Sequence, residues 1–294
     1  MSAAPPDWLA AFIAEERLPA AFADAVANVW APVAERIALA ASARGPGFVV
    51  GVCGAQGGGK STAVAVLARL LAARGLSAAI LSIDDLYLTR EERLALAARV
   101  HPLFATRGPP GTHDVGLAHR LFDALARPGE VALPRFDKAA DTRKPETEWE
   151  RTAAPVDVIL FEGWCVGARP EAAEALARPV NALERDRDPD GAWRAYANAQ
   201  LDGPYRALFA RIDRLILIAA PGFEAVLAWR REQERKLALR LAREGRDPGL
   251  AMDDAAVETF IAHYERITRH ILREMPARAD EVIRLDAERI ALPS

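Results

Sequence analysis

The chain has 294 residues, of which 51% are hydrophobic, and its formal net charge is −3. This size suits one large α/β domain or one domain with an appendage, and the charge provides no basic excess for nucleic acid or an anionic membrane. No strongly apolar run is long enough to span a bilayer. Only two cysteines are present, and acidic residues precede the first basic one, which is unlike a signal or transit peptide, so we expect a cytoplasmic protein.

Residues 1–44 have the pattern of amphipathic helices. Apolar residues recur there with helical spacing in two stripes, and Pro19 and Pro32 interrupt them. We predict an N-terminal helical extension over residues 1–44. A glycine- and proline-rich hinge then leads into a main domain over residues 45–294.

The stretch from Phe48 to Thr62 contains the strongest motif. An apolar run over residues 48–52 predicts a strand, and residues 54–61 then fit G-x-x-x-x-G-K-[ST] at every fixed position. Apolar residues with helical spacing follow up to Gly75, a plausible helix end. Strand, glycine loop and helix in this order indicate a phosphate-binding P-loop. The alternative is a glycine-rich turn that leads into an ordinary helix and binds no ligand.

The residue types in this loop suit a nucleoside triphosphate. Glycines let backbone N–H groups approach phosphate oxygens, and the helix N-terminus adds a partial positive charge. Lys60 can reach the β- and γ-phosphates, and the Ser61 hydroxyl can bind Mg²⁺. We predict that the following residues bind the nucleotide: Gly54, Ala55, Gln56, Gly57, Gly58, Gly59, Lys60, Ser61 and Thr62.

Two aspartates, Asp84 and Asp85, follow a predicted buried strand over residues 78–83. In open α/β sheets, ligands bind beyond the carboxyl ends of the strands, so a carboxylate there is well placed to meet the nucleotide. Either aspartate could instead cap the helix predicted for residues 89–99. Thr89 is the better cap, because Glu92 three residues later completes a capping box. We therefore predict that at least one aspartate is catalytic or near the metal.

The next segment, residues 100–114, is long, polar and rich in proline. It contains Arg107, His113 and Asp114, and structureless loops of this length are usually functional. His113 taken singly is more often a structural hydrogen-bonding residue, and Asp114 could cap the helix predicted for residues 115–125. Composition alone thus favours a substrate site only modestly.

Two further strands are predicted before the middle of the chain. Residues 131–136 form a possible short strand, and the charged run over residues 137–144 reads by default as a solvated loop. Residues 156–161 form a buried strand that ends at Glu162, which fits a Walker B acid that holds the metal or its water. The charged residues 178–191 are expected to form a mobile insertion.

The C-terminal third alternates helices and strands. A helix over residues 193–211 is interrupted near Gly203, and a strand over 215–219 follows. A long helix over residues 222–243 carries many arginines, which would suit either a lid over phosphates or a surface helix with salt bridges. A last helix and a strand over 282–285 complete a parallel sheet covered on both faces.

Several motifs in sequence resemble plant-type D-glycerate 3-kinases and their microbial relatives. This family lies within the wider group of uridine kinase, pantothenate kinase and phosphoribulokinase. The resemblance runs from about residue 48 to the C-terminus. The motifs that carry it are the P-loop, Ser82-Ile83-Asp84-Asp85-Leu86-Tyr87-Leu88-Thr89, Arg107-Gly108-Pro109-Pro110-Gly111-Thr112-His113-Asp114, Pro134-Arg135-Phe136-Asp137-Lys138, Leu160-Phe161-Glu162-Gly163-Trp164, Pro221-Gly222-Phe223-Glu224 and Trp229-Arg230.

The resemblance implies a P-loop kinase fold with five central parallel strands, a helical lid at about residues 222–245, and ATP with Mg²⁺. Asp84 would act as the base and Lys60 as a second catalytic residue, while Ser61, Glu162 and Asp84 would hold the metal. The acceptor residues would be Asp85, Tyr87, Arg107, His113, Asp114, Asp137, Lys138 and Arg143. Arg230 and Arg235 would belong to the lid. A shorter loop after Lys138, and Ala139 in place of a serine, are departures that bear on the acceptor.

We predict ATP-dependent phosphorylation of a hydroxyl on a small polar metabolite, with D-glycerate as the best single acceptor. One alternative is another acceptor, such as a nucleoside, a sugar or a pantothenate-like compound. A different alternative is a P-loop ATPase or switch that acts on a protein partner. The loops at residues 107–114 and 137–143 argue against a switch, and the guanine-specific Asn-Lys-x-Asp motif is absent. We expect a monomer or homodimer that binds neither nucleic acid nor membrane.

Overall fold

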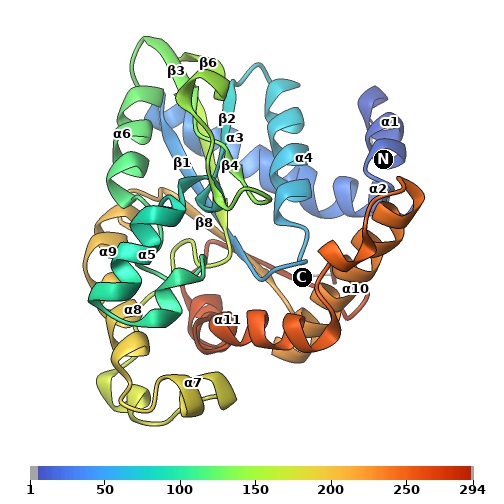
Figure 1. Ribbon diagram of the computed structural model, residues 1–294. Coiled ribbons are helices and arrows are strands. Elements are labelled where there is room, and N and C mark those ends of the chain that lie inside the picture. The colour runs from blue at the N-terminus through green and yellow to red at the C-terminus, as the bar shows by residue number, and fades with distance from the viewer. Residues whose placement is uncertain (1–5, 293–294) are drawn as a thin grey trace.

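A parallel sheet of five strands forms the centre of the fold (Figure 1). The computed structural model describes residues 6–292. The strands lie in the order β2-β7-β1-β8-β9, and every neighbouring pair is parallel. Their bounds are β1 Phe48–Gly54, β2 Ala78–Ser82, β7 Val158–Gly163, β8 Arg214–Ala219 and β9 Glu281–Arg284. This confirms the predicted parallel α/β sheet.

Helices cover both faces of the sheet (Figure 1). They are α1 Asp7–Glu15, α2 Phe22–Ala25, α3 Ala31–Arg44, α4 Lys60–Ala72, α5 Arg90–Arg99, α6 Val115–Leu125, α7 Ala182–Arg187, α8 Ala192–Asp202, α9 Pro204–Phe209, α10 Phe223–Arg243 and α11 Asp254–Glu274. The break between α8 and α9 at Gly203 confirms the predicted interruption. Within residues 6–292, no helix combines the length and apolar character of a membrane span.

Alternate residues of the strands point to opposite faces of the sheet and belong to two hydrophobic cores. Val50 and Val52 of β1 pack on one face with α3, α4 and α10, whereas Val49 and Cys53 pack on the other face with α6 and α9. Every residue of β1 and of β7 is buried, as expected for strands covered on both sides. The sheet is therefore held rigidly beneath the loops at its carboxyl edge.

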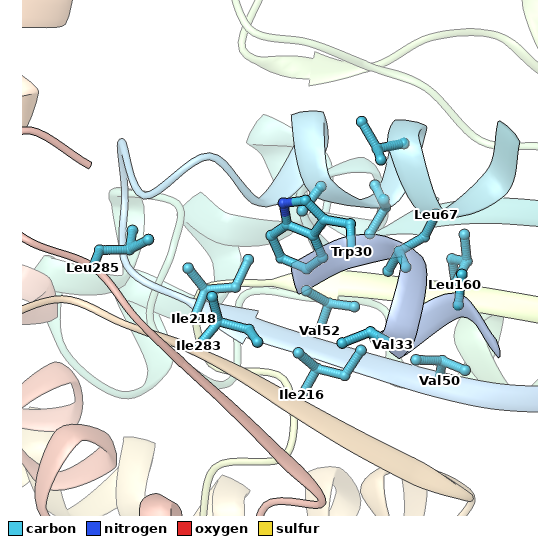
Figure 2. Packing of buried hydrophobic residues seen from close by; sticks show 14 of the residues in the cluster. Trp30, Val33, Val50, Val52, Leu67, Leu160, Ile216, Ile218, Ile283 and Leu285 are labelled. Atoms are coloured by element: carbon cyan, nitrogen blue, oxygen red, sulfur yellow. The ribbon is translucent and has the colours of Figure 1, made fainter. Parts of the chain in front are cut away.

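The N-terminal helices share the first of these cores. Trp30 and Val33 lie beside Val50 and Val52 (Figure 2), and Ile37 belongs to the same cluster. The helical character of residues 7–44 is confirmed, with a π-helical turn at Val26–Trp30 between α2 and α3. The division into an extension over residues 1–44 and a domain over 45–294 stays a prediction, and residues 1–5 and 293–294 lie outside the described part.

Two small antiparallel ribbons project from the sheet. β3 (Gly129–Leu133) pairs with β6 (Glu150–Ala154), and β4 (Phe136–Asp137) pairs with β5 (Thr142–Arg143). The single strand predicted for residues 131–136 was wrong, because Pro134, which has no N–H to give a ladder, separates β3 from β4. The predicted plain loop over residues 137–144 is instead the hairpin of β4 and β5.

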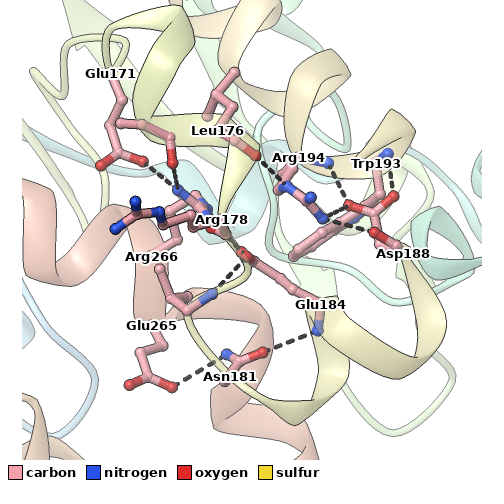
Figure 3. Close-up of polar contacts among 12 residues, drawn as sticks. Glu171, Leu176, Arg178, Asn181, Glu184, Asp188, Trp193, Arg194, Glu265 and Arg266 are labelled. Carbon is pink, nitrogen blue, oxygen red and sulfur yellow. Dashed lines mark hydrogen bonds and ion pairs between the residues drawn. The ribbon is translucent and has the colours of Figure 1, made fainter. Parts of the chain in front are cut away.

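The prediction of a mobile insertion at residues 178–191 was also wrong, since this segment is anchored by buried ion pairs (Figure 3). It contains α7, whose Glu184 lies 2.6 Å from Arg266 of α11. Asp188 lies 3.0 Å from Arg194 of α8. All four side chains are buried, and burial of charges is tolerated when each is paired and hydrogen-bonded. The charged residues of this segment, which suggested a solvent-exposed loop, therefore form a buried network of ion pairs.

Candidate active site

A cavity of about 230 Å³ lies at the carboxyl edge of the sheet. Its wall combines residues that follow β1, β2 and β7 with residues from the hairpin, α10 and α11. The lining residues are Gln56, Gly57, Lys60, Ser61, Asp84, Tyr87, Arg107, Lys138, Glu162, Trp164, Arg230, Gln233, Phe260 and Tyr264. The sheet thus brings together side chains that are far apart in the sequence, as expected for a site at this edge of an α/β fold.

The P-loop connects β1 to α4 and turns through two left-handed glycines. Gly57 has φ +78° and Gly59 has φ +80°, a conformation that other residues adopt only with strain. A Cβ added to Gly57 would also lie 2.9 Å from the Cβ of Trp229, so α10 packs closely against the backbone of Gly57. Lys60 begins α4 and its Nζ donates to the carbonyl oxygen of Ala55 at 3.1 Å. The loop therefore has the geometry that phosphate binding requires.

Four of the nine predicted nucleotide-binding residues line the cavity directly, namely Gln56, Gly57, Lys60 and Ser61. The others form the rest of the loop and the first turn of α4; they are Gly54, Ala55, Gly58, Gly59 and Thr62. Within the described part of the chain, the buried Oε1 of Gln56 has no hydrogen-bond partner. This amide oxygen can only accept a hydrogen bond, so it would pair with a donor group of a ligand and not with a phosphate oxygen.

Two oxygen ligands suited to Mg²⁺ meet beside the P-loop. The Ser61 hydroxyl donates to Oε1 of Glu162 at 3.1 Å, and Glu162 is only 6% exposed. Burial raises the pKa of Glu162, which a nearby cation would oppose. Among residues 6–292, no group of three or more His, Cys, Asp or Glu could hold a metal alone. These two residues fit Mg²⁺ that takes its remaining ligands from phosphate and water, as is usual for this ion.

Asp84 is held between two hydrogen-bond donors. The Tyr87 hydroxyl donates to Oδ1 at 2.8 Å, and the Lys138 ammonium donates to Oδ2 at 3.0 Å. Burial by itself raises the pKa of Asp84, but the Lys138 charge and the hydrogen bonds from Lys138 and Tyr87 outweigh it, so the pKa lies below its usual value. Asp84 is therefore an ionised carboxylate that faces the cavity.

Two other predicted acceptor residues support Tyr87 and do not line the cavity. The His113 ring stacks on the Tyr87 ring at 4.6 Å, and its Nδ1 lies 2.6 Å from the hydroxyl of Tyr205. Burial lowers the pKa of His113 to about 3, so this ring is neutral. Arg143 donates to the carbonyl oxygen of Tyr87 at 3.1 Å. Both residues fix the backbone and ring of Tyr87.

Three predicted acceptor carboxylates do not line the cavity and accept hydrogen bonds from backbone N–H groups. Asp85 accepts from the N–H of Phe136 at 2.9 Å. Asp114 caps α6 by accepting from the N–H of Leu117 at 2.8 Å. Asp137 accepts from the two N–H groups that follow Lys138, at 2.8 and 3.0 Å. Asp114 and Asp137 thus cap a nearby helix and turn, as short acidic side chains readily do, whereas Asp85 links the segment after β2 to β4.

The two predicted lid arginines occupy different places on α10. Arg230 lines the cavity, lies 2.5 Å from Glu234, and places its guanidinium carbon 5.2 Å from the centre of the Phe260 ring. Arg235 instead pairs with Asp254 at the exposed side, at 3.3 Å. Of the two, Arg230 is placed to reach a bound phosphate. Movement of α10 as a lid stays a prediction.

Sequence reasoning missed an aromatic wall of the cavity. Trp164, Phe260 and Tyr264 line it, and the Trp164 and Tyr264 rings meet edge to face at 4.8 Å. Trp164 follows the Walker B acid, which was a usable signal, whereas the two α11 residues belong to a stripe that reads as core packing. Gly108 lies so close that an added Cβ would be 2.1 Å from the hydroxyl of Tyr264. This contact packs the loop that contains Arg107 and Gly108 against α11.

Comparison with known proteins finds relatives both by sequence and by structure. The chain is 31% identical over 226 residues to the uncharacterized kinase mug58 of Schizosaccharomyces pombe, covering 74% of this chain and 78% of that protein. It is 30% identical over 229 residues to the chloroplastic D-glycerate 3-kinase of Arabidopsis thaliana, covering 74% of this chain but 46% of the plant protein. No protein-family model matches the chain.

Among the similar solved structures is the D-glycerate 3-kinase of Cryptococcus neoformans. It superposes with a TM-score of 0.72 at 24% identity, over 90% of this chain and 98% of that one. At this identity the likeness shows the shared fold, in agreement with the sheet and P-loop described above.

Proposed function

Because the chain belongs to the glycerate kinase-like family of P-loop kinases, we propose that its acceptor is D-glycerate and its product 3-phosphoglycerate. The enzyme is an ATP-dependent phosphotransferase that acts on an alcohol group of a small molecule. The observation that carries the proposal is the position of Asp84, which faces one cavity together with P-loop Lys60 and two further cations, Arg107 and Lys138.

Asp84 is the proposed general base. It is ionised and half-buried, and it can accept a hydrogen bond from an acceptor hydroxyl in place of the one from Lys138. As the hydroxyl oxygen bonds to the γ-phosphorus, the bond from that phosphorus to the β–γ bridging oxygen breaks, and the hydroxyl proton passes to Asp84. A positioned base of this kind contributes about 10²–10⁴-fold to rate.

Charge neutralisation is assigned to Lys60 and Arg230, which line the cavity from α4 and α10. Phosphoryl transfer needs positioned positive charge more than covalent help from the protein. Mg²⁺, held by Ser61 and Glu162, would neutralise the phosphate oxygens. Arg230 is the proposed lid contact because Arg235 lies at the exposed side of the same helix.

An anionic acceptor suits the two remaining cations of the cavity. Arg107 and Lys138 project into it from separate loops, and a guanidinium binds a carboxylate through two parallel hydrogen bonds. The volume of about 230 Å³ must also admit the terminal phosphate, which favours a small acceptor over a nucleoside. Both features support glycerate among the possible acceptors.

The test is an acceptor panel, assayed by release of ADP from ATP and Mg²⁺. The panel contains D-glycerate, L-glycerate, glycerol, uridine, a hexose and pantothenate. We expect the highest kcat/KM with D-glycerate and a large loss with glycerol, which lacks the carboxylate. A higher kcat/KM with a nucleoside, sugar or pantothenate would replace the acceptor, and hydrolysis unaffected by any acceptor would favour an ATPase or switch.

Location and assembly remain predictions. Cys53 and Cys165 are buried free thiols, which is compatible with a reducing cytoplasm, although the Arabidopsis relative is named as chloroplastic. A monomer or homodimer without nucleic acid is expected, and light scattering of the purified chain with and without DNA would test this.

A further inference from the structure

A carboxylate that sequence reasoning passed over bridges two arginines beside the cavity. Asp141, in the β4–β5 hairpin, forms ion pairs with both Arg93 and Arg107. Of these three, only Arg107 lines the cavity. We infer that Asp141 and Arg93 are positioning residues that direct the Arg107 guanidinium at an anionic acceptor, an inference that rests on the proposed function.

Arg93 holds together three segments that contribute to the proposed acceptor pocket. Its side chain is fully buried, and its guanidinium donates to the carbonyl oxygens of Leu88 at 2.8 Å, Ala105 at 3.3 Å and Asp141 at 3.2 Å. These acceptors belong to the loop after β2, the loop that carries Arg107, and the hairpin. A planar, always charged group with five donors can hold three segments at once, which a lysine cannot.

The charges of the three residues leave Arg107 available to an anion. Asp141 alone would cancel the charge of Arg107, but the buried charge of Arg93 offsets Asp141, so the group has a net charge of about +1. The Phe136 ring also restrains both guanidiniums, whose central carbons lie 5.6 Å (Arg107) and 5.8 Å (Arg93) from its centre. Arg107 is thus fixed in direction without being neutralised.

The backbone of Asp141 makes an isosteric test possible. Its φ of +54° lies in the left-handed region, where Asn is as well tolerated as Asp. Asp141→Asn therefore removes the charge while it keeps the hairpin. We expect the KM for D-glycerate to rise about tenfold or more, with kcat and the KM for ATP within about twofold, because a charge-assisted contact is lost in binding only.

A double-mutant cycle separates positioning from general damage. In an Arg107→Lys background, Asp141→Asn is expected to raise the KM for D-glycerate by less than about twofold, since the group it orients has already gone. Glu281→Gln is the matched control, because Glu281 also bridges two arginines, at 2.5 Å to Arg36 and 2.7 Å to Arg214, at the opposite edge of the sheet. This control is expected to leave the KM for D-glycerate unchanged.

A readout without turnover keeps the inference independent of the acceptor. Modification by phenylglyoxal, located by peptide mass spectrometry, reports how freely Arg107 moves. We expect Asp141→Asn and Arg93→Lys to speed modification of Arg107 about fivefold or more. Equal modification rates in the native protein and Asp141→Asn would overturn the inference, as would full additivity in the cycle. If D-glycerate is not phosphorylated in the acceptor panel but Arg107 is still modified faster in Asp141→Asn, only the proposed function is overturned.

Discussion

The phosphate side and the acceptor side of the cavity are built in different ways. The phosphate side is centred on one contiguous stretch, residues 54–62, in which main-chain geometry sets the loop and Lys60 bonds to a carbonyl five residues away. The acceptor side takes Asp84, Arg107 and Lys138 from three separate segments. Side-chain ion pairs hold these segments together, through Lys138 on Asp84 and Asp141 on Arg107.

This difference makes the two halves separable. A loop built by local main-chain geometry binds the same phosphates whatever the acceptor, so its alteration should damage every reaction of the enzyme. An acceptor pocket held by long-range side-chain pairs can change its specificity by altering one pair. Variants on the two sides should therefore differ in whether ATP or the acceptor is affected.

The largest effect is expected for Lys60→Ala on the phosphate side. Removal of the cation that begins α4 should lower kcat/KM by about a thousandfold or more and weaken ATP binding, because it stabilises the migrating phosphoryl charge. Isothermal calorimetry with a non-hydrolysable ATP analogue gives the affinity. An unaltered affinity would remove the assignment of this loop to the triphosphate.

Asp84→Asn should abolish most turnover from the acceptor side. A loss of about a hundredfold or more in kcat is expected, since the amide cannot accept the hydroxyl proton, while affinity for ATP should stay within about threefold. The amide retains the shape that accepts from Tyr87. Single-turnover kinetics check the chemical step, and retained activity would contradict the role of base.

The two arginines of α10 provide a matched pair. Arg230→Gln should lower kcat by roughly tenfold to a hundredfold, because the side chain lines the same cavity as the P-loop residues Lys60 and Ser61. Arg235→Gln, which removes an exposed ion pair with Asp254, should change kcat by less than about twofold. Steady-state rates of both variants test this, and equal losses would mean that helix packing, rather than charge, explains the effect.

A smaller effect is expected in the pH dependence of Lys138→Met. Lys138 lowers the pKa of Asp84 against the opposing effect of burial, so its removal should raise that pKa. The acid limb of kcat/KM should then move to higher pH, because Asp84 must be ionised to act. Profiles between about pH 4 and pH 9 measure this, and a limb that stays in place would exclude Lys138 as the cause.

Much of the framework was predictable from local patterns. Each strand of the central sheet was predicted to within about two residues, and the Thr89 and Glu92 capping box is present. These features depend on periodicity, glycine and cap residues that lie within a few positions of each other. The single strand predicted over residues 131–136 was wrong, because the apolar pattern was followed and the local effect of Pro134, which ends β3, was not taken into account.

The acceptor site was only partly predictable. Asp84, Tyr87, Arg107 and Lys138 do line the cavity, but Asp85, Asp114 and Asp137 accept hydrogen bonds from backbone N–H groups outside it. An acidic residue in a loop has the same appearance in a sequence whether it caps a turn or faces a ligand. Its direction depends on which N–H groups lie within reach after folding.

The sequence by itself determined a P-loop on a parallel sheet, because phosphate binding there depends on glycine conformations and on one helix start that a short motif encodes. Only the tertiary structure decided which charges face the acceptor. Arg93 and Asp141 are 48 positions apart, yet their ion pair fixes the direction of Arg107. Such pairs form through packing of separate segments, and their energies depend on burial and geometry that no local pattern specifies.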